Sequence, residues 1–166
     1  GLNGKTAYAY MPTWRGTIGK ISKKEDNRIF NFFREVDSML TDDQVIYIKM
    51  HTVSMSTLKF DKFKRIRPFP EEDTYGFLNA MDGLITDYSS VMFDFAVTGR
   101  KIILFPYDLE EYESTRGFYF PYEELPFPKV FTELELYAEL GKGKQYDDNE
   151  FRKTFCEFDN ANATKK

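Results

Sequence analysis

Short apolar runs alternate with amphipathic stretches along most of this chain. Residues 5–11, 45–50, 83–86 and 101–105 are apolar runs of strand length, and a further short strand is expected at 60–66. Elsewhere apolar residues recur every three or four positions, which predicts helices over about 26–40, 73–81, 91–97, 132–141 and 148–158. Strands that alternate with helices are typical of an α/β fold built on a parallel, doubly wound sheet.

Capping residues indicate where several of these helices begin and end. Asp26 and Asp73 are candidate N-caps, and Thr132 with Glu135 forms a capping box. Gly99 follows the helix expected at 91–97 and is placed to end it.

The stretch 82–106 contains a complete strand–turn–helix–strand unit. Its turn holds Asp87, Ser89 and Ser90 at the start of a helix. Unpaired backbone N–H groups and the helix dipole attract phosphate to such a turn. Serine is also an ordinary N-cap residue, so spacing alone leaves both interpretations open.

Ligands of open parallel sheets bind beyond the carboxyl ends of the strands, and two further candidates fall there. Arg15 follows the first strand and could clamp a phosphate, or simply stack on Trp14. His51, the only histidine, follows the second strand and could donate to a phosphate oxygen or move a proton. Arg116 lies in an aromatic-rich loop that could bind an anion or be purely structural.

Composition narrows the functional classes. The 166 residues are 42% hydrophobic, which suits one globular domain, and the formal net charge of −4 argues against general nucleic-acid binding. One cysteine excludes an internal disulfide framework, and a single histidine cannot build a typical zinc site. The P-loop and dinucleotide-binding glycine patterns are both missing. The chain has no apolar run of about 18 residues and no visible signal peptide.

One basic stretch departs from the overall acidity. Residues 59–67 carry five lysines and arginines, which indicates either a solvated face or contact with an anionic ligand or membrane surface.

Six motifs carry a family resemblance, and their order along the chain matches the order in that family. Residues 84–94 (LITDYSSVMFD) resemble the signature of the CDP-glycerol:poly(glycerophosphate) glycerophosphotransferases, the teichoic-acid polymerases and primases. Residues 11–15 (MPTWR), 48–51 (IKMH), 105–109 (FPYDL), 116–120 (RGFYF) and 158–164 (FDNANAT) are also similar to that family. The resemblance covers nearly the whole chain, and the ordered set is more specific than any one motif.

The resemblance implies a Rossmann-like domain, the C-terminal half of a GT-B glycosyltransferase-type fold. Residues 1–166 would then form a single domain that binds a CDP-alditol, cut from a longer enzyme. That enzyme would transfer glycerol or ribitol phosphate from CDP-glycerol or CDP-ribitol to a lipid-linked polymer and release CMP. The acceptor and the general base would belong to an N-terminal half not present here, so the chain alone would be inactive.

The resemblance also assigns roles to individual residues. Ser89, Ser90, Asp87, Thr13 and Arg116 would bind the donor diphosphate. His51 and Arg15 would act at the reacting phosphate as catalytic residues, whereas Asp94 is expected to be structural. No metal ligand is expected and no cofactor is required, although a divalent cation such as Mg²⁺ is compatible. The full-length enzyme is expected in the cytoplasm, peripheral to the inner face of the cell membrane.

Two alternatives stay open at this point. The chain could be the nucleotide-binding half of a GT-B enzyme that uses a nucleotide sugar, or a non-catalytic α/β interaction module. Binding of UDP or GDP sugars in preference to CDP esters would indicate the first, and the absence of nucleotide binding the second.

Overall fold

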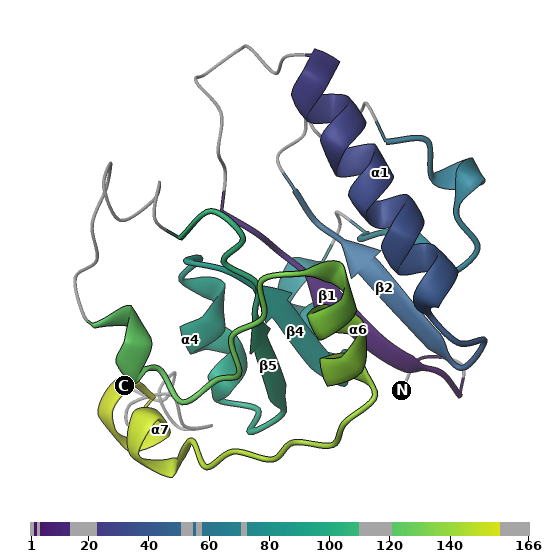
Figure 1. The fold of residues 1–166 in the computed structure, drawn as a ribbon. Helices are drawn as coiled ribbons and strands as arrows, with labels where there is room; N and C mark the ends of the chain where they lie inside the picture. The colour runs from purple at the N-terminus through teal and green to yellow at the C-terminus, as the bar shows by residue number, and fades with distance from the viewer. Residues whose placement is uncertain are drawn as a thin grey trace.

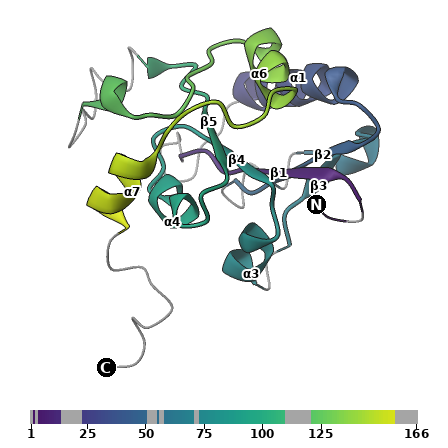
Figure 2. The same cartoon turned by 90° about the horizontal axis from the view of Figure 1, so that it is seen from below.

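A single parallel β-sheet organises the part of the chain that the computed structural model describes, which is residues 2, 4–13, 23–50, 55, 58–70, 73–109 and 121–156. Its strand order is β3-β2-β1-β4-β5 (Figure 1, with β3 labelled in Figure 2). The strands are β1 (Thr6–Tyr10), β2 (Gln44–Ile48), β3 (Ile66–Pro68), β4 (Gly83–Thr86) and β5 (Lys101–Leu104). The order reverses between β1 and β4, so the expected doubly wound parallel sheet is confirmed.

Helices cover both faces of the sheet, as Figure 2 shows. The first face carries α1 (Lys23–Met39) and α6 (Glu133–Leu140). The opposite face carries α3 (Thr74–Asn79), α4 (Val91–Ala96) and α7 (Asn149–Phe155). Two short 3-10 turns, η1 (Phe60–Lys62) and η2 (Tyr122–Glu124), lie in connections between these elements.

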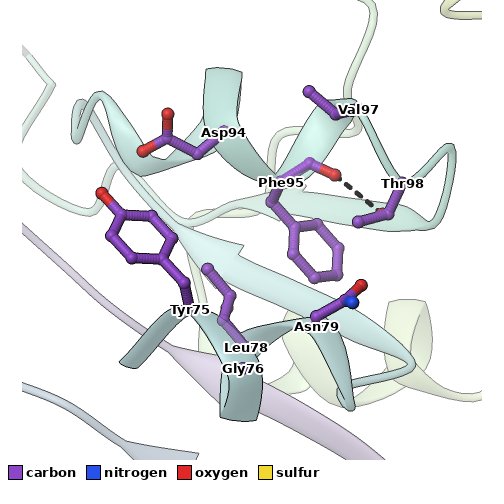
Figure 3. Close-up of a pocket in the computed structure, with 8 residues that line it drawn as sticks. All are labelled: Tyr75, Gly76, Leu78, Asn79, Asp94, Phe95, Val97 and Thr98. Atoms are coloured by element: carbon purple, nitrogen blue, oxygen red, sulfur yellow. Dashed lines mark hydrogen bonds between the residues drawn. The ribbon is translucent and has the colours of Figure 1, made fainter. Parts of the chain in front are cut away.

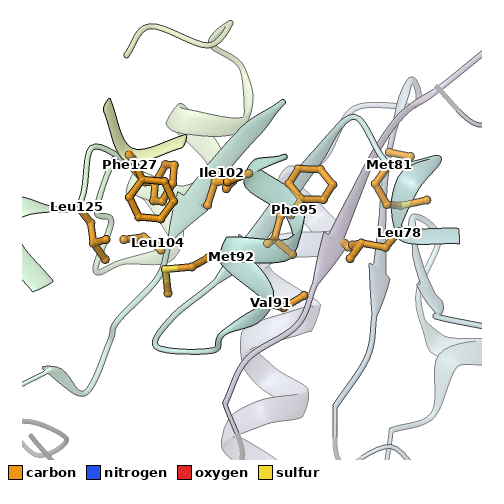
Figure 4. Packing of buried hydrophobic residues seen from close by; sticks show 14 of the residues in the cluster. Leu78, Met81, Val91, Met92, Phe95, Ile102, Leu104, Leu125 and Phe127 are labelled. Carbon is orange, nitrogen blue, oxygen red and sulfur yellow. The ribbon is translucent and has the colours of Figure 1, made fainter. Parts of the chain in front are cut away.

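Alternation along each strand divides the apolar residues between two cores. In β1, Tyr8 and Tyr10 pack toward α1 and α6, whereas the small residues Ala7 and Ala9 face α3 and α4. Both faces are buried, which explains why the strands appear in the sequence as uninterrupted apolar runs. Around α4, Phe95 packs among the side chains labelled in Figure 4.

The outer edge of β5 is covered by later segments of the chain. Leu104 donates its N–H to the carbonyl oxygen of Pro128, and Val130 donates back to Leu104, both at 2.9 Å. The amide of Ile102 donates to the Tyr146 hydroxyl at 2.6 Å, and burial raises the pKa of that phenol above its usual value. Because its backbone groups are paired, this edge is protected from pairing with another chain.

Two local predictions are wrong. Residues 60–66 are not a strand, because η1 occupies Phe60–Lys62 and the strand begins only at Ile66. The apolar side chains of Phe60, Phe63 and Ile66 recur every three residues, a spacing that suits a 3-10 turn better than a strand. Helix α1 begins at Lys23, so Asp26 lies inside the helix and is not its cap.

Other local predictions are confirmed. Asp73 caps α3 by accepting from the amide of Gly76, and Thr132 with Glu135 completes both bonds of a capping box at α6. Gly99 has a φ of +67° just beyond α4, a conformation that glycine adopts without strain. The predicted end of the last helix, at residue 158, lies outside the described residues.

Candidate functional site

The carboxyl ends of β1 and β4 lie side by side where the sheet order reverses. The chain passes from β1 through α1 to β2 on one side, and from β4 through α4 to β5 on the other. Open α/β sheets bind ligands at such a switch point. Thr13 follows β1 by three residues and Asp87 directly follows β4, so the fold brings two of the predicted site residues together here.

The Asp87 side chain joins the two strand ends. Its Oδ1 accepts hydrogen bonds from the Thr13 amide at 2.8 Å, the Thr13 hydroxyl at 2.7 Å and the Tyr88 amide at 2.5 Å. Asp87 is only 1% exposed, so its carboxylate lies beneath the rim and not on it. The Thr86 hydroxyl adds a bond to the carbonyl oxygen of Met11 at 2.7 Å.

Ser89 and Ser90 form the outer part of the β4–α4 turn. Ser90 is exposed, and its hydroxyl makes no capping bond to α4. The Ser89 hydroxyl accepts from the Val91 amide only at 3.5 Å, the long limit for a hydrogen bond. Within the described part of the chain, neither the Ser89 amide nor the Ser90 amide has a hydrogen-bond acceptor. An ordinary N-cap hydroxyl accepts from an amide of the first helical turn, and Ser90 makes no such bond. The two serine amides and the Ser90 hydroxyl therefore have no partner among the described residues and can donate to a ligand.

Three of the predicted site residues cannot be placed at this rim. Arg15, His51 and Arg116 lie outside the described residues, so their contacts with the donor stay predictions. Thr13, Asp87, Ser89 and Ser90 are placed, and all four belong to the switch point between β1 and β4.

The β4–α4 turn is also held by tyrosine contacts to which the sequence assigned no role. The Tyr122 hydroxyl donates to the backbone oxygen of Asp87 at 3.1 Å, and the Tyr122 ring lies 5.3 Å from that of Tyr88. The Tyr88 hydroxyl donates to Asp108 Oδ1 at 3.1 Å. Sequence spacing gave no signal for these contacts, because they join segments up to 35 positions apart.

An open groove of about 500 Å³ lies elsewhere, between α3 and α4 (Figure 3). Tyr75 stands on one wall and Asp94 on the other, while Leu78 and Phe95 line its floor. None of the placed site residues lines this groove. We therefore place the candidate site at the switch point.

The described residues hold neither a cluster of metal ligands nor a membrane-spanning helix. They contain no group of three or more histidine, cysteine, aspartate or glutamate side chains arranged to hold a metal ion. They also contain no helix that is both long enough and apolar enough to cross a membrane.

Part of the basic stretch 59–67 serves the fold itself. Arg65 pairs with Asp42 at 2.5 Å, and the Arg67 guanidinium donates to the backbone oxygens of Phe63, Lys64 and Ile66. The side chains of Lys59, Lys62 and Lys64 remain exposed.

Comparison with known proteins assigns the family. The family model described as CDP-Glycerol:Poly(glycerophosphate) glycerophosphotransferase matches residues 2–166. The chain belongs to this family. The resemblance carried by the ordered motifs is therefore confirmed.

Several glycerophosphotransferase relatives match over most of the chain. The teichoic acid glycerol-phosphate transferase of Staphylococcus aureus is 34% identical across 98% of this chain and 44% of its own length. The teichoic acid poly(glycerol phosphate) polymerase of Staphylococcus epidermidis is 33% identical across 96% of this chain and 24% of its own length. The chain therefore spans less than half the length of these relatives.

A solved structure from the same group has the same fold. The wall teichoic acid polymerase TagF superposes with a TM-score of 0.81 at 30% identity, covering 98% of this chain and 41% of that one. A histidine-to-asparagine variant of TagF, soaked with CDPG, matches with a TM-score of 0.80. The expected fold class, a Rossmann-like α/β domain of the GT-B type, is confirmed.

Proposed function

We propose that this chain is the donor-binding domain of a transferase that moves glycerol phosphate, or ribitol phosphate, from a CDP-alditol to a hydroxyl of a lipid-linked polymer. The match across 98% of the chain to a teichoic acid polymerase carries this proposal. Relatives named for glycerol-phosphate and for ribitol-phosphate polymers support both donors. The acceptor site and the general base are assigned to the part of such an enzyme that this chain does not match.

The rim of the sheet suits the diphosphate of that donor. The amides of Ser89 and Ser90 and the Ser90 hydroxyl have no partner among the described residues, the Ser89 hydroxyl has only its long contact with the Val91 amide, and Thr13 is bonded to Asp87 of the same turn. Backbone N–H groups at such a turn favour phosphate oxygens over neutral ligands. In this proposal Ser89, Ser90 and Thr13 contact the diphosphate, and Arg15, His51 and Arg116 add positive charge or a proton.

The chemistry requires charge stabilisation more than covalent participation by the protein. The acceptor oxygen attacks the β-phosphorus, and the bond from that phosphorus to the bridging oxygen breaks as CMP leaves with the electron pair. The hydroxyl proton passes to the general base outside this chain. Donors fixed around the diphosphate oxygens stabilise the charge that grows on CMP. The proposal requires no cofactor and is compatible with Mg²⁺.

Calorimetric titration of this chain tests the donor assignment. CDP-glycerol and CDP-ribitol should bind, and UDP-glucose and GDP-mannose should bind much more weakly. Ser90→Ala should weaken CDP-glycerol binding by at least about tenfold, because a hydrogen bond to a charged group contributes about 1.5–3 kcal/mol. Ser38→Ala is the matched control, since that exposed hydroxyl only donates to the backbone of α1. No binding of either CDP ester would refute the proposal, and a preference for UDP or GDP sugars would indicate a nucleotide-sugar enzyme.

We also propose that the exposed lysines of the basic stretch contact an anionic membrane surface in the full-length enzyme. Lys59, Lys62 and Lys64 extend into solvent, and each lysine near such a surface contributes about 1 kcal/mol. Co-sedimentation with phosphatidylcholine vesicles should increase when phosphatidylglycerol is added. A Lys59→Gln/Lys62→Gln variant should lose that increase, whereas Lys5→Gln/Lys153→Gln should keep it. Binding that does not depend on anionic lipid would contradict this part of the proposal.

A further inference from the structure

The contacts between β1 and β4 continue after the sheet ladder itself has ended. The last ladder pair joins Tyr10 to Ile85, and Met11 then donates its amide to the carbonyl oxygen of Ile85 at 2.9 Å. Beyond that point the two strand ends are joined by hydrogen bonds of side chains. The Thr86 hydroxyl donates to the Met11 carbonyl oxygen, and the Thr13 hydroxyl donates to the Asp87 carboxylate. Among the described residues, Asp87 thus makes the last contact between the two strand ends.

Burial and charge argue against direct donor contact by Asp87. Its carboxylate lies beneath the turn, with one oxygen accepting from three donors of Thr13 and Tyr88. A carboxylate placed against a diphosphate would repel it, and the repulsion grows as water is excluded. The same carboxylate, bonded to Thr13 from below, can instead set the distance between Thr13 and the Ser89–Ser90 pair.

Tyr122 restrains the same turn from its other side. The residue is 4% exposed, and its hydroxyl donates to the Asp87 backbone oxygen at 3.1 Å. The ring of Tyr88 packs against that of Tyr122, and its hydroxyl bonds Asp108. The Asp87–Tyr88 dipeptide is therefore bonded through its side chains to the β1 end and to the segment after β5, and through its backbone to Tyr122.

We infer that Asp87 and Tyr122 are positioning residues, which hold Thr13 and the Ser89–Ser90 turn in one arrangement competent to bind the donor diphosphate. This inference rests on the proposed function and changes the expected role of Asp87 from donor ligand to support. Neither residue touches the donor. Without them, the N–H and O–H groups of Thr13, Ser89 and Ser90 should no longer be held in one arrangement, and binding of the donor diphosphate should weaken.

A pair of tyrosine variants separates positioning from general stability. Tyr122→Phe removes one buried hydroxyl bond at the rim, and Tyr8→Phe removes an equivalent bond, from Tyr8 to the Leu140 oxygen at 3.2 Å, at the opposite end of the strands. Tyr122→Phe should weaken CDP-glycerol binding about 3- to 10-fold, whereas Tyr8→Phe should leave it within about twofold. Both should lower the melting temperature similarly. Equal affinities for the two variants would overturn the inference.

Hydrogen exchange at the Thr13 amide tests the Asp87 tie without any ligand. Asp87→Ala should accelerate Thr13 exchange at least about tenfold and weaken donor binding, while Asp87→Asn, which retains an acceptor oxygen, should rescue most of both properties. Should Asp87→Ala unfold the chain, the asparagine and Tyr122→Phe variants still test the inference. Lost affinity with unchanged Thr13 exchange would indicate direct donor contact and overturn it.

The failure of the proposed function can be told apart from the failure of this inference. If the unmodified chain binds no CDP-alditol, the proposed function fails, and the exchange measurement still decides whether Asp87 holds Thr13. If the unmodified chain binds and all variants bind equally, only the positioning role is refuted.

Discussion

Glu139 should make stability depend on pH, because it pairs with two lysines at the amino ends of the strands. Its carboxylate oxygens lie 3.0 Å from Lys101 Nζ and 2.9 Å from Lys142 Nζ. Lys101 is 6% exposed and also donates to the backbone oxygens of Glu139 and Lys142. Burial disfavours the carboxylate, but hydrogen bonds from Lys142 and Lys101 and their charges outweigh it, so the pKa of Glu139 is lowered.

The expected cost of Glu139→Gln follows from what each lysine retains. Removing one member of a fully buried ion pair costs about 3–5 kcal/mol. Here Lys142 is half exposed and can be solvated, and Lys101 keeps two carbonyl acceptors. We therefore expect the free energy of unfolding to fall by about 2 kcal/mol at pH 7.

The pH dependence has a definite sign. A carboxyl whose pKa is lower in the folded state stabilises the protein above its unfolded pKa and loses that contribution as pH falls through the folded pKa. The difference between the unmodified chain and Glu139→Gln should therefore be complete at neutral pH and shrink below about pH 4.5, the ordinary value for glutamate.

Urea denaturation at several pH values measures this difference. Glu35→Gln is the control, because Glu35 is an exposed helical glutamate and should show little change at any pH. A Glu139→Gln penalty that is absent at pH 7, or equally large at all pH values, would refute the assignment of the ion pair.

Three other substitutions test the core packing around Phe95, the cap of α6 at Thr132 and the close contact between Gly83 and the Tyr8 ring. Phe95→Ala should lower the free energy of unfolding by about 3–5 kcal/mol, because the ring is 1% exposed in the core below α4; a loss under about 1 kcal/mol in urea denaturation would contradict that packing. Thr132→Ala should cost about 1 kcal/mol by removing the α6 cap, and an unchanged denaturation midpoint would contradict it. Gly83→Ala should cost about 1–3 kcal/mol, since the new Cβ would lie 2.6 Å from the Tyr8 ring; full stability in thermal unfolding would show that the ring moves freely.

The local elements of the fold could be predicted because their signals are local. Two-sided burial made β4 and β5 continuous apolar runs, and the caps at Asp73 and Thr132 act within four residues of the chain. The errors arose where local signals were ambiguous. Phe60 and Phe63 are apolar enough for a strand, but on the edge of β2 opposite β1 the strand pairing begins only at Ile66.

The candidate site could be predicted in part. Thr13, Ser89 and Ser90 follow strand ends, and the general rule for parallel sheets predicted that they share one rim before the strand order was known. The burial of Asp87 and its hydrogen bonds from Thr13 could not be predicted, because sequence spacing carries no information on the direction in which a carboxylate points.

The sequence by itself determined the type of nearly every element, the class of the sheet and the family, because apolar period, caps and ordered motifs are properties of neighbouring residues. Only the tertiary structure decided which strand ends meet, since pairing β1 with β4 joins residues more than 70 positions apart. That pairing turned the serine turn into part of a shared rim, with Asp87 buried beneath it and Tyr122 behind it. Long-range contacts of this kind depend on how the whole chain packs, which no local pattern encodes.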